Sequence, residues 1–148
     1  MKIVIGSDHG GFILKGVVVK HLESLGYEVL DLGTDSSKSC DYPVIAIKVS
    51  RKVLELKDTL GILVCGTGLG MSICANKIKG IRASHCTDTY SARLTRQHND
   101  SNILCLGERI TGQGLAIDIV DEWLKGTFNG GRHQKRVNMI TEIESENI

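Results

Sequence analysis

A cysteine followed by a glycine-rich turn is the part of this chain best suited to chemistry. Cys65 ends an apolar run, and Gly66, Gly68 and Gly70 follow it at alternating positions. Apolar residues then return at helical spacing, so the pattern predicts a buried strand, a tight turn and a helix. Glycines let backbone N–H groups approach a ligand closely, and a helix N-terminus attracts negative charge. We therefore expect an anion-binding loop with a thiol at its mouth.

Two interpretations of Cys65 are open on the residues alone. A cysteine at the end of a core strand is commonly a small buried hydrophobic residue. A cysteine beside a helix N-terminus can instead be held as a thiolate and act as a base or nucleophile. Cys74, Cys86 and Cys105 lack that setting and are expected to be structural.

The glycine loop does not match the known nucleotide-binding patterns. The dinucleotide fingerprint needs its third glycine where this chain has Met71. That fingerprint also follows the first strand of its fold, whereas this loop follows the third predicted strand. No Walker-type sequence occurs in the chain. NAD and Walker-type nucleotide binding are therefore disfavoured, whereas a turn that merely lets a helix pack on a sheet stays open.

Polar residues after two other apolar runs are further candidates. Asp8 and His9 follow the first run, and Arg109 follows the last. An Asp-His pair in such a loop either orients a sugar hydroxyl or phosphate or is simply a polar turn. Arg109 is expected at the same edge, where a guanidinium suits a phosphate.

A second group of candidates lies late in the chain. His98 and Asn99 close a predicted helix, where an imidazole either complements the helix dipole or serves as a general acid or base. Arg132 and Arg136 are four residues apart, so they share one helix face and could hold a phosphate, although a solvated basic face has the same pattern. His85-Cys86 has no second pair at ligand spacing, so no metal site is expected.

The alternation of strand and helix patterns predicts the fold. We expect strands at 3–5, 29–32, 62–65, 81–84 and 103–106, and helices at 12–25, 43–56, from the glycine loop to 79, 88–98, 113–125 and 132–144. This order predicts a three-layer α/β/α sandwich with a five-stranded parallel Rossmann-like sheet. Ligands bind such sheets at the carboxyl ends of the strands, where the loops 7–11, 66–70 and 107–112 should meet.

Composition limits the class of partner. A chain of 148 residues suits a single domain over 1–148, with 139–148 as a helix end and tail. The 18 Lys and Arg against 17 Asp and Glu leave no basic field for nucleic acid or an anionic membrane. Five cysteines without a C-x-x-C pair, and no signal-peptide or membrane-spanning pattern, predict a cytoplasmic protein with reduced thiols. The expected partner is a small molecule.

Five motifs in order resemble the type B ribose-5-phosphate isomerases, a family that also includes galactose-6-phosphate isomerase subunits. The resemblance spans Lys2 to about Val137. The motifs are Gly6-Ser7-Asp8-His9-Gly10-Gly11, Cys40-Asp41-Tyr42-Pro43, Cys65-Gly66-Thr67-Gly68-Leu69-Gly70, Arg93-Leu94 through His98-Asn99-Asp100, and Leu106-Gly107 through Arg109. The resemblance implies a phosphorylated sugar substrate, no metal or organic cofactor, and a homodimer or dimer of dimers whose sites draw residues from two subunits.

The resemblance also implies a role for each matching residue. Cys65 resembles the base that moves a proton between C2 and C1 of the open-chain sugar, and Thr67 and His98 resemble the pair that helps open the furanose ring. Backbone N–H groups from Gly66 to Gly70 would hold the enediolate oxygen. The substrate-binding positions so implied are Asp8, His9, Tyr42, Gly66, Gly68, Leu69, Gly70, Asn99, Arg109, Arg132 and Arg136, with His9 and the arginines favouring the phosphate.

The function implied is an aldose-ketose isomerase that interconverts D-ribose 5-phosphate and D-ribulose 5-phosphate through an enediolate after ring opening. An isomerase of allose 6-phosphate or galactose 6-phosphate is the nearest alternative. A non-catalytic phosphometabolite-binding module and a redox sensor built on Cys65 are alternatives from other classes.

Overall fold

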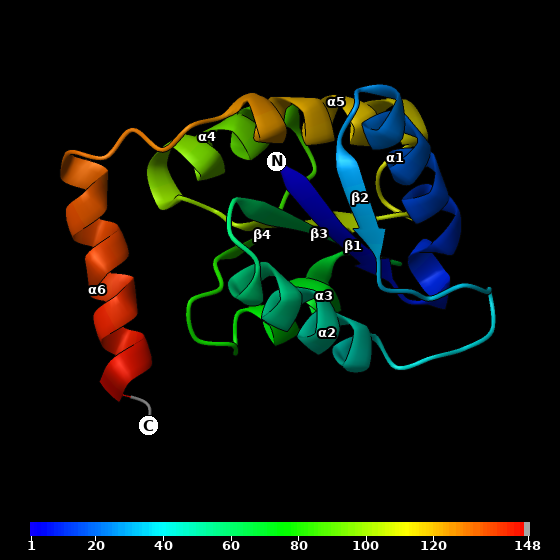
Figure 1. Cartoon of the computed structure of the whole chain (residues 1–148), viewed down its shortest axis with the longest axis horizontal. Coiled ribbons are helices and arrows are strands. Elements are labelled where there is room, and N and C mark those ends of the chain that lie inside the picture. Colours follow the sequence, from blue (N-terminus) through cyan, green and yellow to red (C-terminus); the bar gives the residue numbers. More distant parts are fainter. Residues whose placement is uncertain (147–148) are drawn as a thin grey trace.

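The computed structural model describes residues 1–146 and is built on a five-stranded parallel sheet (Figure 1). The sheet order is β2-β1-β3-β5-β4. The strands are β1 (Lys2–Ser7), β2 (Glu28–Asp31), β3 (Thr59–Cys65), β4 (Ala83–His85) and β5 (Ile103–Gly107). The predicted parallel sheet is confirmed. The last two residues of the predicted tail, 147 and 148, lie outside the described residues.

Helices cover both faces of the sheet. One layer holds α1, α4 and α5, and the other holds α2 and α3 (Figure 1). The helices are α1 (Phe12–Ser24), α2 (Tyr42–Glu55), α3 (Leu69–Ala75), α4 (Thr89–Asn99), α5 (Gln113–Lys125) and α6 (Arg132–Glu146), with a short 3-10 turn η1 (His9–Gly11) before α1. The predicted three-layer α/β/α sandwich is therefore confirmed.

The apolar runs of the central strands follow from this arrangement. In β3, Ile62 and Val64 pack toward α1, α4 and α5, whereas Leu63 and Cys65 pack toward α2 and α3. Each of these residues is buried because both faces of the strand are covered. A continuous apolar run ending in Cys65 is thus a core strand, and its carboxyl end carries the thiol out to the sheet edge.

The chain between α3 and β4 differs from the sequence prediction. Helix α3 ends at Ala75 rather than near residue 79, and β4 covers Ala83–His85 rather than 81–84. The Asn76 side chain donates to the Ala83 carbonyl and accepts from the Ala83 N–H, both at 2.8 Å. These two bonds close a turn that hydrophobic periodicity does not predict.

Helix α6 stands apart from the two layers, at one end of the molecule (Figure 1). Val137 is its buried anchor, while Met139, Ile140 and Ile143 remain 52%, 39% and 56% exposed. Within one protomer, α6 therefore leaves an apolar stripe uncovered.

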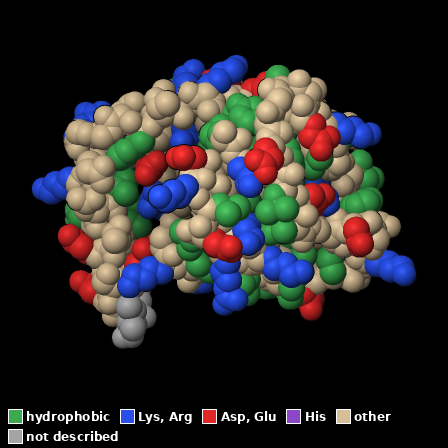
Figure 2. All heavy atoms as spheres, in the orientation of Figure 1, with side chains coloured by type: hydrophobic (Ala, Val, Ile, Leu, Met, Phe, Trp, Pro, Cys, Tyr) green, Lys and Arg blue, Asp and Glu red, His purple; other side chains and the backbone are tan. Residues whose placement is uncertain are grey.

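Charged side chains of both signs are interspersed over the face seen in Figure 2. This distribution agrees with the nearly balanced charge of the sequence. In residues 1–146, no helix is both long enough and apolar enough to cross a membrane.

Candidate active site

The switch point of the sheet lies between β1 and β3. From β1 the chain passes to β2 on one side, and from β3 it passes to β4 on the other. Because α1 and α3 cover opposite faces, the loops after β1 and β3 diverge at the carboxyl ends of the strands, the place where ligands bind sheets of this kind. We use the name carboxyl-edge cluster for the predicted site residues at these loops: Asp8, His9, Tyr42, Cys65, Gly66, Thr67, Gly68, Leu69, Gly70 and Arg109.

Cys65 is the last residue of β3 and only 5% exposed. The Gly68 N–H donates to its Sγ at 3.1 Å. Gly68 has a φ of 80°, in the left-handed region that favours glycine, and this conformation turns its N–H back toward the sulfur. The turn therefore holds a hydrogen-bond donor against the sulfur.

Three other cysteines lie in environments that raise the pKa of the thiol. Burial, followed by the charge of Asp88, raises the pKa of Cys86 to about 11. Burial, followed by the nearby Cys65 and Cys86, raises the pKa of Cys105 well above its usual value. Burial also raises the pKa of Cys74. These thiols stay protonated at neutral pH, consistent with the structural role predicted for them.

The amides of the glycine loop divide into two groups. The Gly68 N–H is bonded to Cys65, and the Leu69 N–H donates to Thr67 Oγ1 at 3.3 Å. The N–H groups of Gly66, Thr67 and Gly70 have no protein partner in the described part of the chain. These three amides are therefore the ones available to an anionic oxygen.

The loop after β1 packs directly on the glycine loop. The Asp8 N–H donates to the Val64 carbonyl at 3.2 Å, and the Asp8 carboxylate accepts the Gly10 N–H at 2.8 Å. A Cβ on Gly10 would lie 3.1 Å from the Gly66 nitrogen, so only glycine allows this approach. His9 Nδ1 accepts the Cys40 N–H at 3.3 Å, which leaves Nε2 to carry the proton of a neutral ring.

The loop after β5 completes this edge. Arg109 donates its N–H to the Gly66 carbonyl at 3.0 Å, and its Nη1 is 3.2 Å from the position that a Cβ on Gly66 would take. The Tyr42 ring covers Gly70, where a Cβ would lie 2.9 Å from its Cζ. A guanidinium and a phenol thus flank the amides on both sides.

Glu108 belongs to this edge and is missed by sequence reasoning. Its N–H donates to the Cys65 carbonyl at 2.9 Å, and its carboxylate accepts the Leu14 N–H at 2.8 Å. The carboxylate thereby occupies the N-terminus of α1. This bond joins residues 94 positions apart, so no local sequence pattern identifies Glu108.

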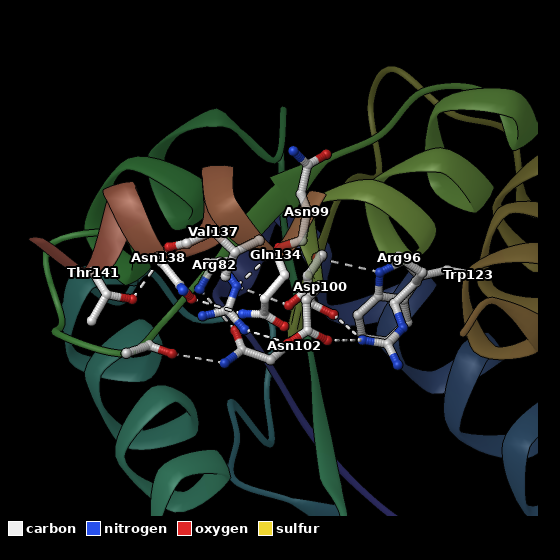
Figure 3. Close-up of polar contacts among 12 residues, drawn as sticks. Arg82, Arg96, Asn99, Asp100, Asn102, Trp123, Gln134, Val137, Asn138 and Thr141 are labelled. Atoms are coloured by element: carbon white, nitrogen blue, oxygen red, sulfur yellow. Dashed lines mark hydrogen bonds and ion pairs between the residues drawn. The ribbon is translucent and has the colours of Figure 1, made fainter. Parts of the chain in front are cut away.

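The structure does not bring the remaining predicted residues to Cys65 within one protomer. Helix α4 begins after the carboxyl end of β4 and runs back to Asn99, whose carbonyl accepts from Arg82 Nε at 2.9 Å. Figure 3 shows Asn99 beside Arg82. Arg82 directly precedes β4, so Asn99 lies at the amino edge of the sheet, whereas Cys65 ends β3 at the carboxyl edge. We use the name amino-edge cluster for His98, Asn99, Arg132 and Arg136.

Two stacked histidines connect the parts of the amino-edge cluster. The His98 ring stacks on the His133 ring of α6, with centroids 4.1 Å apart and planes 5° from parallel. Desolvation, followed by the charges of His98, Arg132 and Arg136, lowers the pKa of His133. The stack therefore fixes the beginning of α6, with both arginines, against the end of α4.

The fold and the carboxyl-edge cluster define a class of protein, an α/β protein whose parallel sheet presents a buried thiol and a glycine-rich loop at its carboxyl edge. The chain belongs to the Ribose/Galactose Isomerase family, whose sequence profile matches residues 3–140. It is 54% identical over 143 residues to ribose-5-phosphate isomerase B of Escherichia coli, covering 97% of this chain and 96% of that protein.

Solved structures agree with this assignment. Ribose-5-phosphate isomerase B of Clostridium thermocellum has 55% identity and a TM-score of 0.96, with all of both chains covered. The enzyme of Mycoplasma genitalium, solved with bound ribulose-5-phosphate, has 43% identity and a TM-score of 0.94, with 98% of this chain and 97% of that chain covered. The resemblance inferred from the five motifs is confirmed.

Proposed function

We propose that this protein is an aldose-ketose isomerase that interconverts D-ribose 5-phosphate and D-ribulose 5-phosphate. The observation that carries the proposal is the Cys65 thiol, which accepts the Gly68 N–H at 3.1 Å beside amides free to bind an oxyanion. The names of its relatives, and the ribulose-5-phosphate bound to the Mycoplasma genitalium enzyme, support the same substrate.

Cys65 is the group that moves the proton. Its thiolate removes the proton from C2 of the open-chain aldose, and the electron pair left behind places negative charge on the O1 oxygen of an enediolate. The N–H groups of Gly66, Thr67 and Gly70 stabilise that charge. Return of the proton to C1, together with transfer of the O2 hydroxyl proton to O1, gives the ketose, so the isomerisation proceeds by proton transfers without redox chemistry.

The complete site requires two copies of the chain. His98 and Asn99 lie at the opposite sheet edge from Cys65, so a partner protomer supplies the amino-edge cluster to each carboxyl-edge cluster. Arg132 and Arg136 of that partner join His9 and Arg109 around the phosphate. The uncovered apolar stripe of α6, with Ile140 and Ile143, supports association as a homodimer or dimer of dimers.

Isomerisation in heavy water tests this function. With ribose 5-phosphate in D₂O, we expect ribulose 5-phosphate that carries deuterium at C1, because the proton taken from C2 exchanges on the thiol. Nuclear magnetic resonance detects both the ketose and the label. Absence of ketose and of label would remove the proposal, leaving a binding or redox-sensing protein.

Hexose phosphates provide the substrate control. Allose 6-phosphate and galactose 6-phosphate are offered to the same preparation under the same conditions. A higher kcat/KM on either of them than on ribose 5-phosphate would contradict the pentose assignment while leaving the isomerase chemistry intact.

A further inference from the structure

The C-terminal end of α4 is fastened by an arginine from another element (Figure 3). Arg82 Nε lies 2.9 Å from the Asn99 carbonyl and 3.0 Å from the Asp100 carbonyl. Its Nη2 donates to Asp100 Oδ2 at 2.8 Å. One guanidinium therefore binds two carbonyls that the helix itself leaves without partners, together with the side chain that follows them.

Asp100 also contacts a second arginine. Arg96 Nη1 lies 3.6 Å from Asp100 Oδ1, and its guanidinium lies 5.6 Å from the centre of the Trp123 ring. Trp123 is fully buried and donates to Ser101 Oγ at 3.3 Å. The carboxylate thus connects the end of α4 to the core of the protein.

Electrostatics make the carboxylate necessary to this arrangement. Burial lowers the pKa of Arg96, the charge of Asp100 raises it, and the like charge of Arg82 lowers it. Two guanidinium groups converge here, and Asp100 is the acidic group paired with both. Its backbone has a φ of 48°, a left-handed conformation that Asp and Asn tolerate better than most residues, and its N–H caps the helix at the Thr95 carbonyl.

We propose that Asp100 and Arg82 are positioning residues that hold His98 and Asn99 in the orientation needed for ring opening. His98 is two residues before Asp100, and Arg82 binds the backbone of Asn99 directly. Neither positioning residue needs to touch the sugar. The inference rests on the proposed function and deepens it, because it separates a ring-opening half of the site from the proton-transfer half at Cys65.

The chemistry of the two substrates allows this separation to be measured. Ribose 5-phosphate enters as a closed furanose and must be opened. Ribulose 5-phosphate has its C5 oxygen in the phosphate ester, so it cannot close a furanose ring onto C2 and enters open. Deuterium exchange at C1 of saturating ribulose 5-phosphate in D₂O therefore reports on Cys65 alone, whereas turnover of ribose 5-phosphate reports on both halves.

The variant Asp100→Asn removes the charge and keeps the tolerated backbone conformation. We expect kcat for ribose 5-phosphate to fall about tenfold, part of the contribution of a general acid, while C1 exchange of the ketose stays within about twofold. Equal losses in both rates would overturn the inference, because a merely structural defect would affect both halves. Absence of both rates in the wild-type protein would overturn the proposed function itself.

A double variant provides the second readout. If Asp100 acts through His98, adding Asp100→Asn to His98→Asn should cause no further loss of kcat. In the His98→Asn protein, turnover depends on the sugar that is already present as free aldehyde. If the double variant instead loses kcat by the product of the two single-variant losses, the inference is contradicted. Arg82→Lys keeps the positive charge and loses the Nε donor, so it should lower kcat for ribose 5-phosphate without lowering C1 exchange of the ketose. This variant replaces Asp100→Asn in the test if Asp100→Asn does not fold.

The matched control is Glu28→Gln, which removes the exposed Lys2–Glu28 ion pair at the same sheet edge. It exchanges a carboxylate for an amide, as Asp100→Asn does. We expect both rates to remain at the wild-type level.

Discussion

At the scale of single residues, one hydrogen bond distinguishes Cys65 from the other buried cysteines. Cys65 and Cys105 lie on neighbouring strands and face the same core, yet only Cys65 accepts an N–H, from Gly68. Burial without such a donor favours the neutral thiol of Cys105. Position at the end of a strand, where the Gly68 N–H reaches the sulfur, therefore distinguishes Cys65 from Cys105.

Removal of this thiol is the first prediction at the residue scale. Cys65→Ala should reduce kcat for ribose 5-phosphate by at least about a thousandfold, as loss of a general base does, because the variant lacks the base proposed to take the C2 proton. Binding of the sugar phosphate, measured by calorimetry, should change by less than about threefold, since the phosphate contacts remain.

The matched control is Cys74→Ala, on the helix that follows the glycine loop. Its thiol has a raised pKa and donates only a long bond to the Pro43 carbonyl, at 3.9 Å. Wild-type turnover is expected in this variant. Wild-type turnover in Cys65→Ala would instead assign the base to another residue.

At the scale of elements, sequence patterns located most of the fold because each pattern reports a local property. The apolar run before Cys65 is a strand buried on both faces, and the alternating glycines are the turn that packs against Gly10, Tyr42 and Arg109. The sheet order, with β5 inserted between β3 and β4, depends on contacts distant in the chain and has no periodic signal.

Prediction of the site residues from sequence has the same limit. Residues that follow strand ends could be placed together from sequence, because parallel strands share a carboxyl edge. The separation of His98 from Cys65 follows from the length and direction of α4, which returns the chain to the amino edge. Glu108 acts through a bond to Leu14, 94 residues away, and no local pattern reports such a contact.

The glycine loop gives a prediction at the element scale. Gly68→Ala places a Cβ 2.5 Å from His85 Cδ2 and 3.0 Å from the Leu106 carbonyl carbon, at a φ of 80°. The left-handed conformation alone costs about 1–2 kcal/mol, so we expect the free energy of unfolding to fall by at least that amount. Turnover should fall as well, because the displaced N–H no longer donates to Cys65.

Gly16 provides the opposite case for comparison. It lies inside α1, and a Cβ there would meet nothing within 4 Å. Gly16→Ala should therefore raise the free energy of unfolding by about 0.5–1 kcal/mol with turnover unchanged. Denaturant titration of both variants tests the pair, and a neutral Gly68→Ala would mean that the loop is not constrained by its backbone.

At the scale of the whole molecule, the distribution of site residues accounts for α6. The helix carries Arg132 and Arg136 away from the protomer's own thiol and fixes them beside His98 through the stack with His133. A groove of about 780 Å³ runs between α6 and the edge of β4, with Asn99 and Ile143 among its lining residues. Asn99 of the amino-edge cluster lines this groove, whereas Cys65 does not.

Mixing two inactive variants tests the shared site. Cys65→Ala retains an intact amino-edge cluster, and His98→Asn retains an intact carboxyl-edge cluster. After the two proteins are unfolded together and refolded at equal concentrations, half of the dimers should be mixed, and each mixed dimer should hold one site with both Cys65 and His98. We therefore expect about a quarter of wild-type turnover of ribose 5-phosphate from two preparations that each have almost none.

Each variant taken through the same refolding alone is the control and should stay inactive. Recovery in the mixture would require that Cys65 of one protomer and His98 of its partner act on the same sugar, because neither parent protein contains both. If each site were instead built within one chain, no combination of these subunits could restore it, and the mixture would remain as inactive as its parents. The recovered fraction therefore distinguishes a site shared between copies from one that α4 and α6 complete by folding back.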